Sequence, residues 1–185
     1  MFKRIIIIFF IGILNINNNA FSDDKILKSL KEGKKLVFIR HAIAPGNGDP
    51  AGFNLNDCFT QRNLSENGKR QAQRIGEFFN KNKIEIDKVL SSEWCRCKET
   101  AKIAFKNFST NNFLNSFYSS KYAKNKDKQI KALNDYIRKF QSDKNLILIT
   151  HYVLISEVLN YAPSSGEIVV SDKNFNMIGS IEINY

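Results

Sequence analysis

The chain has 185 residues, of which 43% are hydrophobic, so it is long enough for one domain with a sizeable core. Its formal net charge is +10, which favours anionic ligands or surfaces. The lysines between residues 121 and 131 are dispersed among asparagines and Asp127, without an aromatic-interleaved basic stripe, so we do not expect a nucleic-acid-binding protein.

The first residues resemble a targeting segment. Lys3 and Arg4 precede a ten-residue apolar run, Ile5–Leu14, which is too short to span a bilayer as a mature helix. A small-x-small pattern suited to cleavage ends at Ser22. We therefore expect a signal peptide over residues 1–22, cleaved near Ser22, and a periplasmic or secreted protein. The alternative is an uncleaved anchor, which would be the only contact with a membrane.

The rest of the chain alternates between predicted strands and helices. Short apolar runs predict strands over 36–40, 88–92, 146–150, 167–171 and 177–183, and helical spacing predicts helices over about 24–31, 64–82, 94–105, 130–140 and 154–161. Ser65 is the predicted N-cap of the second helix. Segment 113–118 is irregular and a candidate strand, and the Gly- and Pro-rich segment 44–62 is a predicted loop. This order predicts one α/β domain over residues 23–185, with three layers and a mainly parallel central sheet covered by helices on both faces.

Three cysteines allow one disulfide in an oxidising compartment. Cys95 and Cys97 point to different faces of a helix, so we favour a bridge between Cys58 and Cys95. A zinc site is the alternative, but the chain has no Cys-x-x-Cys pair.

The two histidines of the chain each follow a predicted strand: His41 comes after 36–40 and His151 after 146–150. The carboxyl ends of such strands line the ligand crevice of α/β sheets. Arg40 adjoins the first histidine, and Arg96 lies in the first turn of a predicted helix, whose N-terminus attracts anions. Each residue alone is more often structural. Together, a neutral imidazole nucleophile and fixed guanidinium donors suit phosphoryl transfer.

Four segments carry a resemblance to a known family. Arg40-His41-Ala42 after its strand resembles the Arg-His-Gly motif of the histidine phosphatase (phosphoglycerate mutase-like) superfamily, and we expect an exported branch of it. Ser91-Ser-Glu-Trp-Cys-Arg-Cys-Lys-Glu-Thr-Ala101 is similar to the second motif of that family, Ser-Ser-x-x-x-Arg-x-x-x-Thr-Ala. Leu64-Ser-Glu-Asn-Gly68 resembles its helix start, and Leu146-Ile-Leu-Ile-Thr-His151 its second histidine strand.

The resemblance implies roles for these residues. His41 would be the phosphorylated nucleophile, and Arg40, Arg96 and His151 would complete the phosphate pocket, with His151 donating to a phosphoryl oxygen. Neither a metal nor another cofactor is implied. The loop from Asn47 to Asn63 would line the entrance for a small anionic phosphorylated substrate, and Arg62 and Asn47 are its candidate contacts.

One departure concerns the proton donor. Many members of the family carry an acid after the second arginine segment, but Phe113-Leu-Asn-Ser-Phe-Tyr-Ser-Ser120 has none. Asp49, Asp57 and Glu93 are the candidate substitutes, and the sequence selects none of them. Without an acid, substrates with good leaving groups are favoured, such as a phosphohistidine or an anhydride.

Two functions follow from these residues. The first is an exported phosphatase that hydrolyses a phosphomonoester through a phosphohistidine on His41. The alternative is a phosphate-binding module of the same fold without catalysis. A phosphoesterase with two His-x-Thr/Ser motifs is excluded, because Ile43 and Val153 stand at the hydroxyl positions.

Overall fold

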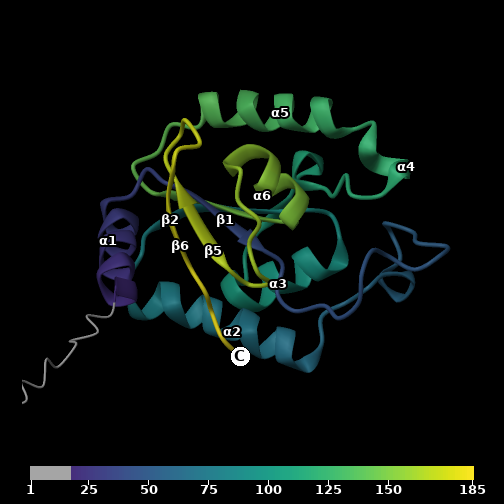
Figure 1. Ribbon diagram of the computed structural model, residues 1–185, viewed down its shortest axis with the longest axis horizontal. Helices are drawn as coiled ribbons and strands as arrows, with labels where there is room; N and C mark the ends of the chain where they lie inside the picture. The colour runs from purple at the N-terminus through teal and green to yellow at the C-terminus, as the bar shows by residue number, and fades with distance from the viewer. Residues whose placement is uncertain (1–17) are drawn as a thin grey trace, which may run out of the picture.

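The computed structural model describes residues 18–185, which form a single six-stranded sheet with the strand order β3-β2-β4-β1-β5-β6 (Figure 1). Strands β1 to β4 pair in parallel, and β5 and β6 add to the β1 edge as antiparallel strands. The strands are β1 (Leu36–Arg40), β2 (Ile86–Ser91), β3 (Ser109–Thr110), β4 (Asn145–Thr150), β5 (Ile168–Ser171) and β6 (Met177–Ile181).

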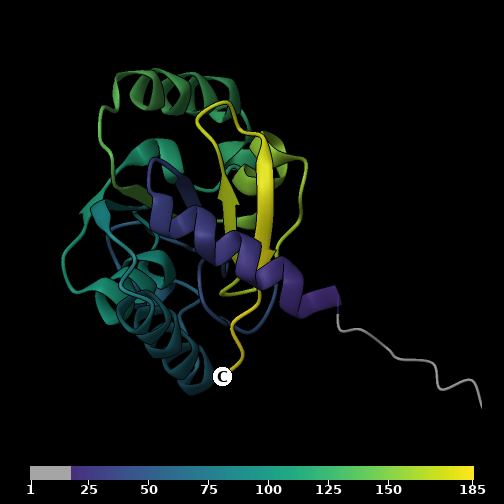
Figure 2. The same ribbon diagram turned by 90° about the vertical axis from the view of Figure 1, so that its left-hand side faces the viewer.

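Helices cover both faces of the sheet (Figures 1 and 2). They are α1 (Asn18–Glu32), α2 (Glu66–Lys81), α3 (Cys95–Phe105), α4 (Ser120–Ala123), α5 (Lys126–Lys139) and α6 (Tyr152–Leu159). Helices α1, α2 and α3 contribute to one hydrophobic cluster, and α5 and α6 contribute to the other. The structure therefore confirms the predicted three-layer α/β fold.

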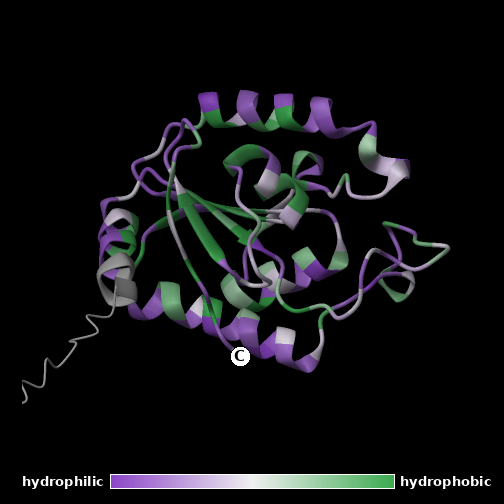
Figure 3. Cartoon of the chain, viewed as in Figure 1, coloured by the Kyte–Doolittle hydropathy of each residue, from purple (hydrophilic) through white to green (hydrophobic). Residues whose placement is uncertain are grey.

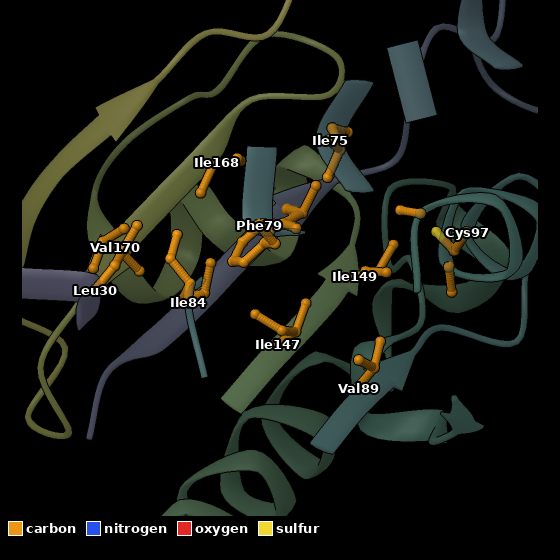
Figure 4. Packing of buried hydrophobic residues seen from close by; sticks show 14 of the residues in the cluster. Leu30, Ile75, Phe79, Ile84, Val89, Cys97, Ile147, Ile149, Ile168 and Val170 are labelled. Atoms are coloured by element: carbon orange, nitrogen blue, oxygen red, sulfur yellow. The ribbon is translucent and has the colours of Figure 1, made fainter. Parts of the chain in front are cut away.

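The two clusters follow from the alternation of side chains along each strand. In β4, Ile147 and Ile149 pack in the cluster with α1 to α3 (Figure 4). Leu146 and Leu148 pack in the cluster with α5 and α6. All four are fully buried, which explains why the strand reads as a continuous apolar run. Helices α2 and α5 have polar outer and apolar inner faces (Figure 3).

The start of α2 lies against the turn that follows β1. Ser65 caps the helix by accepting a hydrogen bond from the Gly68 amide (3.1 Å), as predicted, and its own amide donates to the Ile43 carbonyl (3.0 Å). A Cβ on Gly68 would lie 2.1 Å from the same carbonyl oxygen, so only glycine allows this approach. The helix thereby fixes the backbone just beyond His41.

Several predictions differ from the structure in detail. Segment 113–118 holds no strand: a 3-10 turn spans Asn112–Leu114, and the short strand β3 precedes it. A second 3-10 turn, Cys58–Thr60, interrupts the predicted loop 44–62. Both differences involve one or two hydrogen-bonded turns, which are too short to produce a hydrophobic period.

The predicted signal segment falls mainly on residues 1–17, which lie outside the described residues. The first predicted helix is longer than expected, because α1 begins at Asn18, before the predicted cleavage position. Cleavage near Ser22 stays a prediction. Within residues 18–185, no helix combines the length and the apolar character needed to cross a membrane.

Candidate active site

The two histidines meet at the carboxyl edge of the parallel strands. Arg40 at the end of β1 pairs in register with Thr150 at the end of β4, so His41 and His151 emerge side by side. Their ring centroids are 5.5 Å apart, and each residue is only 3% exposed. Parallel pairing of the two apolar strands therefore brings together imidazoles that are 110 residues apart in the sequence.

His41 has one ring nitrogen fixed by the backbone. Its Nδ1 lies 2.9 Å from the carbonyl oxygen of Ala42, which can only accept, so Nδ1 carries the proton. The Ala42 amide in turn donates to Oγ1 of Thr100 (3.0 Å), which holds the turn in place. In the neutral ring Nε2 then has the lone pair, and no described residue hydrogen-bonds to it. This is the arrangement that a nitrogen nucleophile requires.

His151 is held by a chain of polar side chains. Ser92 Oγ lies 2.9 Å from His151 Nε2 and donates to Oδ1 of Asn115 (3.1 Å). The amide of Asn115 is oriented by Glu93, whose carboxylate accepts from Nδ2 (2.6 Å) and whose backbone amide donates to Oδ1 (2.9 Å). Because the Ser92 proton points to Asn115, Ser92 accepts from His151. Nε2 of His151 therefore carries the proton, and Nδ1 lies 3.5 Å from Nη2 of Arg96.

Both histidines are neutral in the free protein. Burial lowers the pKa of His41 well below its ordinary value, and the nearby charge of Arg96 lowers it further. The pKa of His151 is lowered well below its ordinary value by the same two causes in the same order. The nucleophilic nitrogen of His41 is thus unprotonated at neutral pH.

Arg96, in the first turn of α3, is 3% exposed and is paired with a carboxylate. Asp49 accepts from its Nη1 through Oδ1 (2.6 Å) and lies 3.4 Å from Nη2 through Oδ2. Trp94 Nε1 donates to the same Oδ2 (3.0 Å). The loop that carries Asp49 thus reaches across to the guanidinium group that is expected to bind phosphate.

Two further arginines border the site. Arg40 donates from Nη1 to the carbonyl of Pro163 (2.9 Å), and burial lowers its pKa. Arg62 donates to the carbonyls of Gly48 (2.8 Å) and Ala44, so it braces the loop after β1. Its pKa is also lowered, first by burial and then by the charge of Arg96.

These residues line one cavity of about 540 Å³. The charged side chains in its wall are three arginines, one lysine and one carboxylate: Arg40, Arg62, Arg96, Lys121 and Asp49. The cavity therefore carries a net positive charge. The Nε atoms of Arg40 and Arg96 are buried and have no hydrogen-bond partner among the described residues. A buried donor without a partner is costly, and a tetrahedral anion would satisfy such donors.

The structure separates the three candidate acids. Asp49 lines the cavity, as does Asn47, whereas Asp57 and Glu93 do not. Asp57 caps the 3-10 turn through the Phe59 amide, and Glu93 holds Asn115. From the predicted entrance loop 47–63, residues 47–50, 52, 53 and 62 reach the cavity wall.

The cysteines tie this loop to α3. Cys58 and Cys95, the pair favoured from the sequence, form a disulfide with a Cα–Cα distance of 5.7 Å. Cys97 is a buried free thiol, and burial raises its pKa to about 12. The disulfide joins the residue before Arg96 to the loop that carries Asp49 and Arg62.

Comparison with known protein families gives a match. Residues 36–116 match the model of the histidine phosphatase superfamily (branch 1), a span that includes His41 and Arg96. No curated protein matches the sequence.

Several solved structures share the fold of this chain. The protein histidine phosphatase SixA complexed with tungstate is 15% identical, with a TM-score of 0.55 over 81% of this chain and 96% of that one. The protein TTHB049 from Thermus thermophilus is 14% identical, with a TM-score of 0.54 over 80% and 99%. Phosphoserine phosphatase from Entamoeba histolytica in complex with 3-phosphoglyceric acid is 17% identical, with a TM-score of 0.52 over 82% and 96%. At these identities the likeness establishes the fold.

Proposed function

We propose that this chain, which belongs to the histidine phosphatase superfamily, hydrolyses phosphoric monoesters through a phosphohistidine formed on His41. One observation carries the proposal. His41 is buried and neutral, its Nδ1 is fixed by the Ala42 carbonyl, and it lines a cavity that also holds three guanidinium groups. That combination supplies a nucleophile and the positive charge that a phosphoryl group in transfer requires.

The reaction has two displacements at phosphorus. In the first, Nε2 of His41 forms a bond to phosphorus while the bond to the leaving oxygen breaks. In the second, a water oxygen attacks phosphorus, the P–N bond breaks, and inorganic phosphate and neutral His41 are released. Arg40, Arg96 and Arg62 would hold the equatorial oxygens in both steps, because they surround the same cavity.

His151 would bind the phosphoryl group as an imidazolium. Its Nε2 donates its proton to Ser92. The other ring nitrogen, Nδ1, which lies near Arg96, can therefore donate to a phosphoryl oxygen only after the ring binds a second proton. A bound dianion would stabilise this cation and raise the pKa of His151 from its lowered value. Ligand binding would then be coupled to proton uptake.

This coupling predicts a pH dependence of sulfate binding. Sulfate stays fully ionised over the range of about pH 5 to 8 in which histidine titrates, so any pH dependence comes from the protein. The affinity should rise as the pH falls through the window between the raised pKa of His151 in the complex and its lowered pKa in the free protein. The expected slope from this residue is up to about tenfold per pH unit, measured by titration calorimetry. An equal slope in His151→Gln would contradict the assignment.

Asp49 is placed to compete with the substrate for Arg96. Both of its oxygens already accept hydrogen bonds from Arg96 and Trp94, so in this conformation the carboxylate is an acceptor and not a proton donor. We therefore propose that the leaving group departs without a proton from Asp49. Such a site favours leaving groups that are stable as anions or that need no proton.

Asp49→Asn tests this assignment. Removing the competing charge should strengthen the binding of orthovanadate on the order of fivefold, because Asp49 keeps part of its surface exposed although Arg96 is buried. The kcat with p-nitrophenyl phosphate, whose leaving group needs no proton, should change little. Asp57→Asn is the matched control, because Asp57 lies on the same loop and does not line the cavity. A loss of turnover confined to alkyl phosphates, whose leaving groups need a proton, would instead make Asp49 the acid.

The proposed function itself is tested by the release of phosphate from p-nitrophenyl phosphate. We expect turnover, and we expect millimolar orthovanadate to raise the melting temperature, because it binds only the folded protein. Turnover no faster than that of a His41→Ala control, together with a vanadate shift, would favour the non-catalytic phosphate-binding module.

We also propose that the protein is exported. The positively charged start and apolar run over 3–14 support this, as does the Cys58–Cys95 disulfide, which persists in an oxidising compartment. Fractionation of cells that express the full chain, with mass analysis of the N-terminus, would test both the location and cleavage near Ser22.

A further inference from the structure

The cavity is larger than a phosphoryl group needs. Its volume is about 540 Å³, whereas a phosphoryl group has the bulk of a few water molecules, each about 30 Å³. Volumes of this size accommodate ligands with one or more rings. Most of the cavity is therefore available to the leaving group.

Aromatic side chains form much of the wall. The single tryptophan of the chain and three of its six tyrosines line the cavity. Trp94 stacks on Phe53 with ring centroids 5.3 Å apart and an interplanar angle of 20°. Tyr122 meets both rings edge-on, at 5.3 Å from Trp94 and 6.0 Å from Phe53. The three rings support one another and present a preformed apolar surface.

Two more tyrosines form an aromatic rim, which we define as Tyr118 and Tyr152. They are 58% and 38% exposed, and their ring centroids are 6.0 Å apart. The ring of Tyr152 lies 5.5 Å from the guanidinium carbon of Arg40, so the rim adjoins a proposed phosphate-binding group. Large aromatic side chains that stay exposed beside a cavity are typical of ligand contacts.

The carboxylates give independent support. Among residues 18–185, Asp49 is the only acidic residue in the wall, and its oxygens accept hydrogen bonds from Arg96 and Trp94. A leaving group that receives no proton must be stable as an anion. A phenolate meets this requirement better than an alkoxide, because its charge is delocalised over the ring.

We propose that the leaving-group side of the cavity binds a planar aromatic ring, and that the substrates are aryl phosphate monoesters, of which the phosphotyrosine side chain is one. This inference rests on the proposed function for its chemistry. The ring would lie against the aromatic rim, and Tyr118 would determine specificity for it. Stacking of this kind contributes about three- to tenfold in affinity.

A binding experiment tests the ring site without catalysis. Phenylphosphonate and methylphosphonate carry the same charged group and are not hydrolysed, and they differ in the ring. Wild type should bind phenylphosphonate about three- to tenfold more tightly in calorimetric titrations. The preference should disappear in Tyr118→Ala, and it should persist in Tyr118→Phe and in Tyr185→Ala, a control at an exposed tyrosine outside the cavity. Equal affinities in wild type, or an unchanged preference in Tyr118→Ala, would overturn the proposal.

A turnover experiment separates this inference from the proposed function. Phenyl phosphate and hexafluoroisopropyl phosphate have leaving groups of similar acidity, and only the first has a ring. We expect kcat/KM to favour phenyl phosphate in wild type and to become equal in Tyr118→Ala. Equal values in wild type with turnover that depends on His41 would leave the phosphatase intact and remove the ring site. Tighter binding of phenylphosphonate without turnover of either ester would leave the ring site intact and remove the phosphatase.

Discussion

The His41→Ala variant is expected to release phosphate from p-nitrophenyl phosphate no faster than buffer alone. No other described side chain offers the same combination: a neutral nitrogen, a partner that fixes the opposite ring position, and a place in the wall of the cationic cavity. His151 cannot replace it, because its Nε2 is bonded to Ser92 and its Nδ1 lies against Arg96. Loss of the nucleophile should therefore remove the covalent route altogether.

Two measurements separate loss of the nucleophile from loss of the fold. Radiolabelled substrate should leave a phosphoenzyme that is stable to base and labile to acid on wild type and none on His41→Ala. The variant should still show a rise in melting temperature with orthovanadate, because all three arginines remain. Substantial turnover in His41→Ala, or a phosphoenzyme on another residue, would remove His41 from the mechanism.

The sequence predicted the central part of the fold because its strands are buried on both faces. The runs ending at Arg40 and Thr150 contain only apolar residues before the tip, so their position and type could be read directly. Parallel pairing then required His41 and His151 to lie at the same edge. The predicted helix cap at Ser65 has the same origin, since a cap is set by local hydrogen bonds.

The rest of the site depends on the conformation of loops. Loops have no hydrophobic periodicity from which their conformation could be predicted. The pairing of Asp49 with Arg96 joins residues 47 positions apart through a loop with three glycines at positive φ. Asn115 gave no signal in the sequence, although it fixes Ser92 and thereby the tautomer of His151. The sequence also did not predict that Phe53, Trp94 and Tyr122 line the cavity, because their contacts depend on loop conformation.

The Arg96→Ala variant is expected to lower kcat/KM for p-nitrophenyl phosphate on the order of 100-fold or more. Arg96 is buried, its Nε lacks a partner among the described residues, and its charge acts on both histidines. Its loss removes a bidentate donor from the equatorial oxygens, where charge accumulates during transfer. Arg96→Lys should recover only part of the rate, because an ammonium group lacks the planar fork. Arg74→Ala, on the exposed face of α2, is the control for loss of a positive charge.

The loss of kcat/KM in Arg96→Ala could also come from Asp49, and the double variant Asp49→Asn with Arg96→Ala distinguishes the two origins. Without its partner, Asp49 would stand as an unpaired negative charge in the cavity and would repel the substrate. If Arg96 acts on the phosphoryl group, Asp49→Asn combined with Arg96→Ala should stay within a few fold of Arg96→Ala alone. Recovery to near the wild-type rate would instead mean that Arg96 serves mainly to neutralise Asp49. Because the two residues are in direct contact, the coupling free energy from this cycle measures how much of the loss belongs to each role.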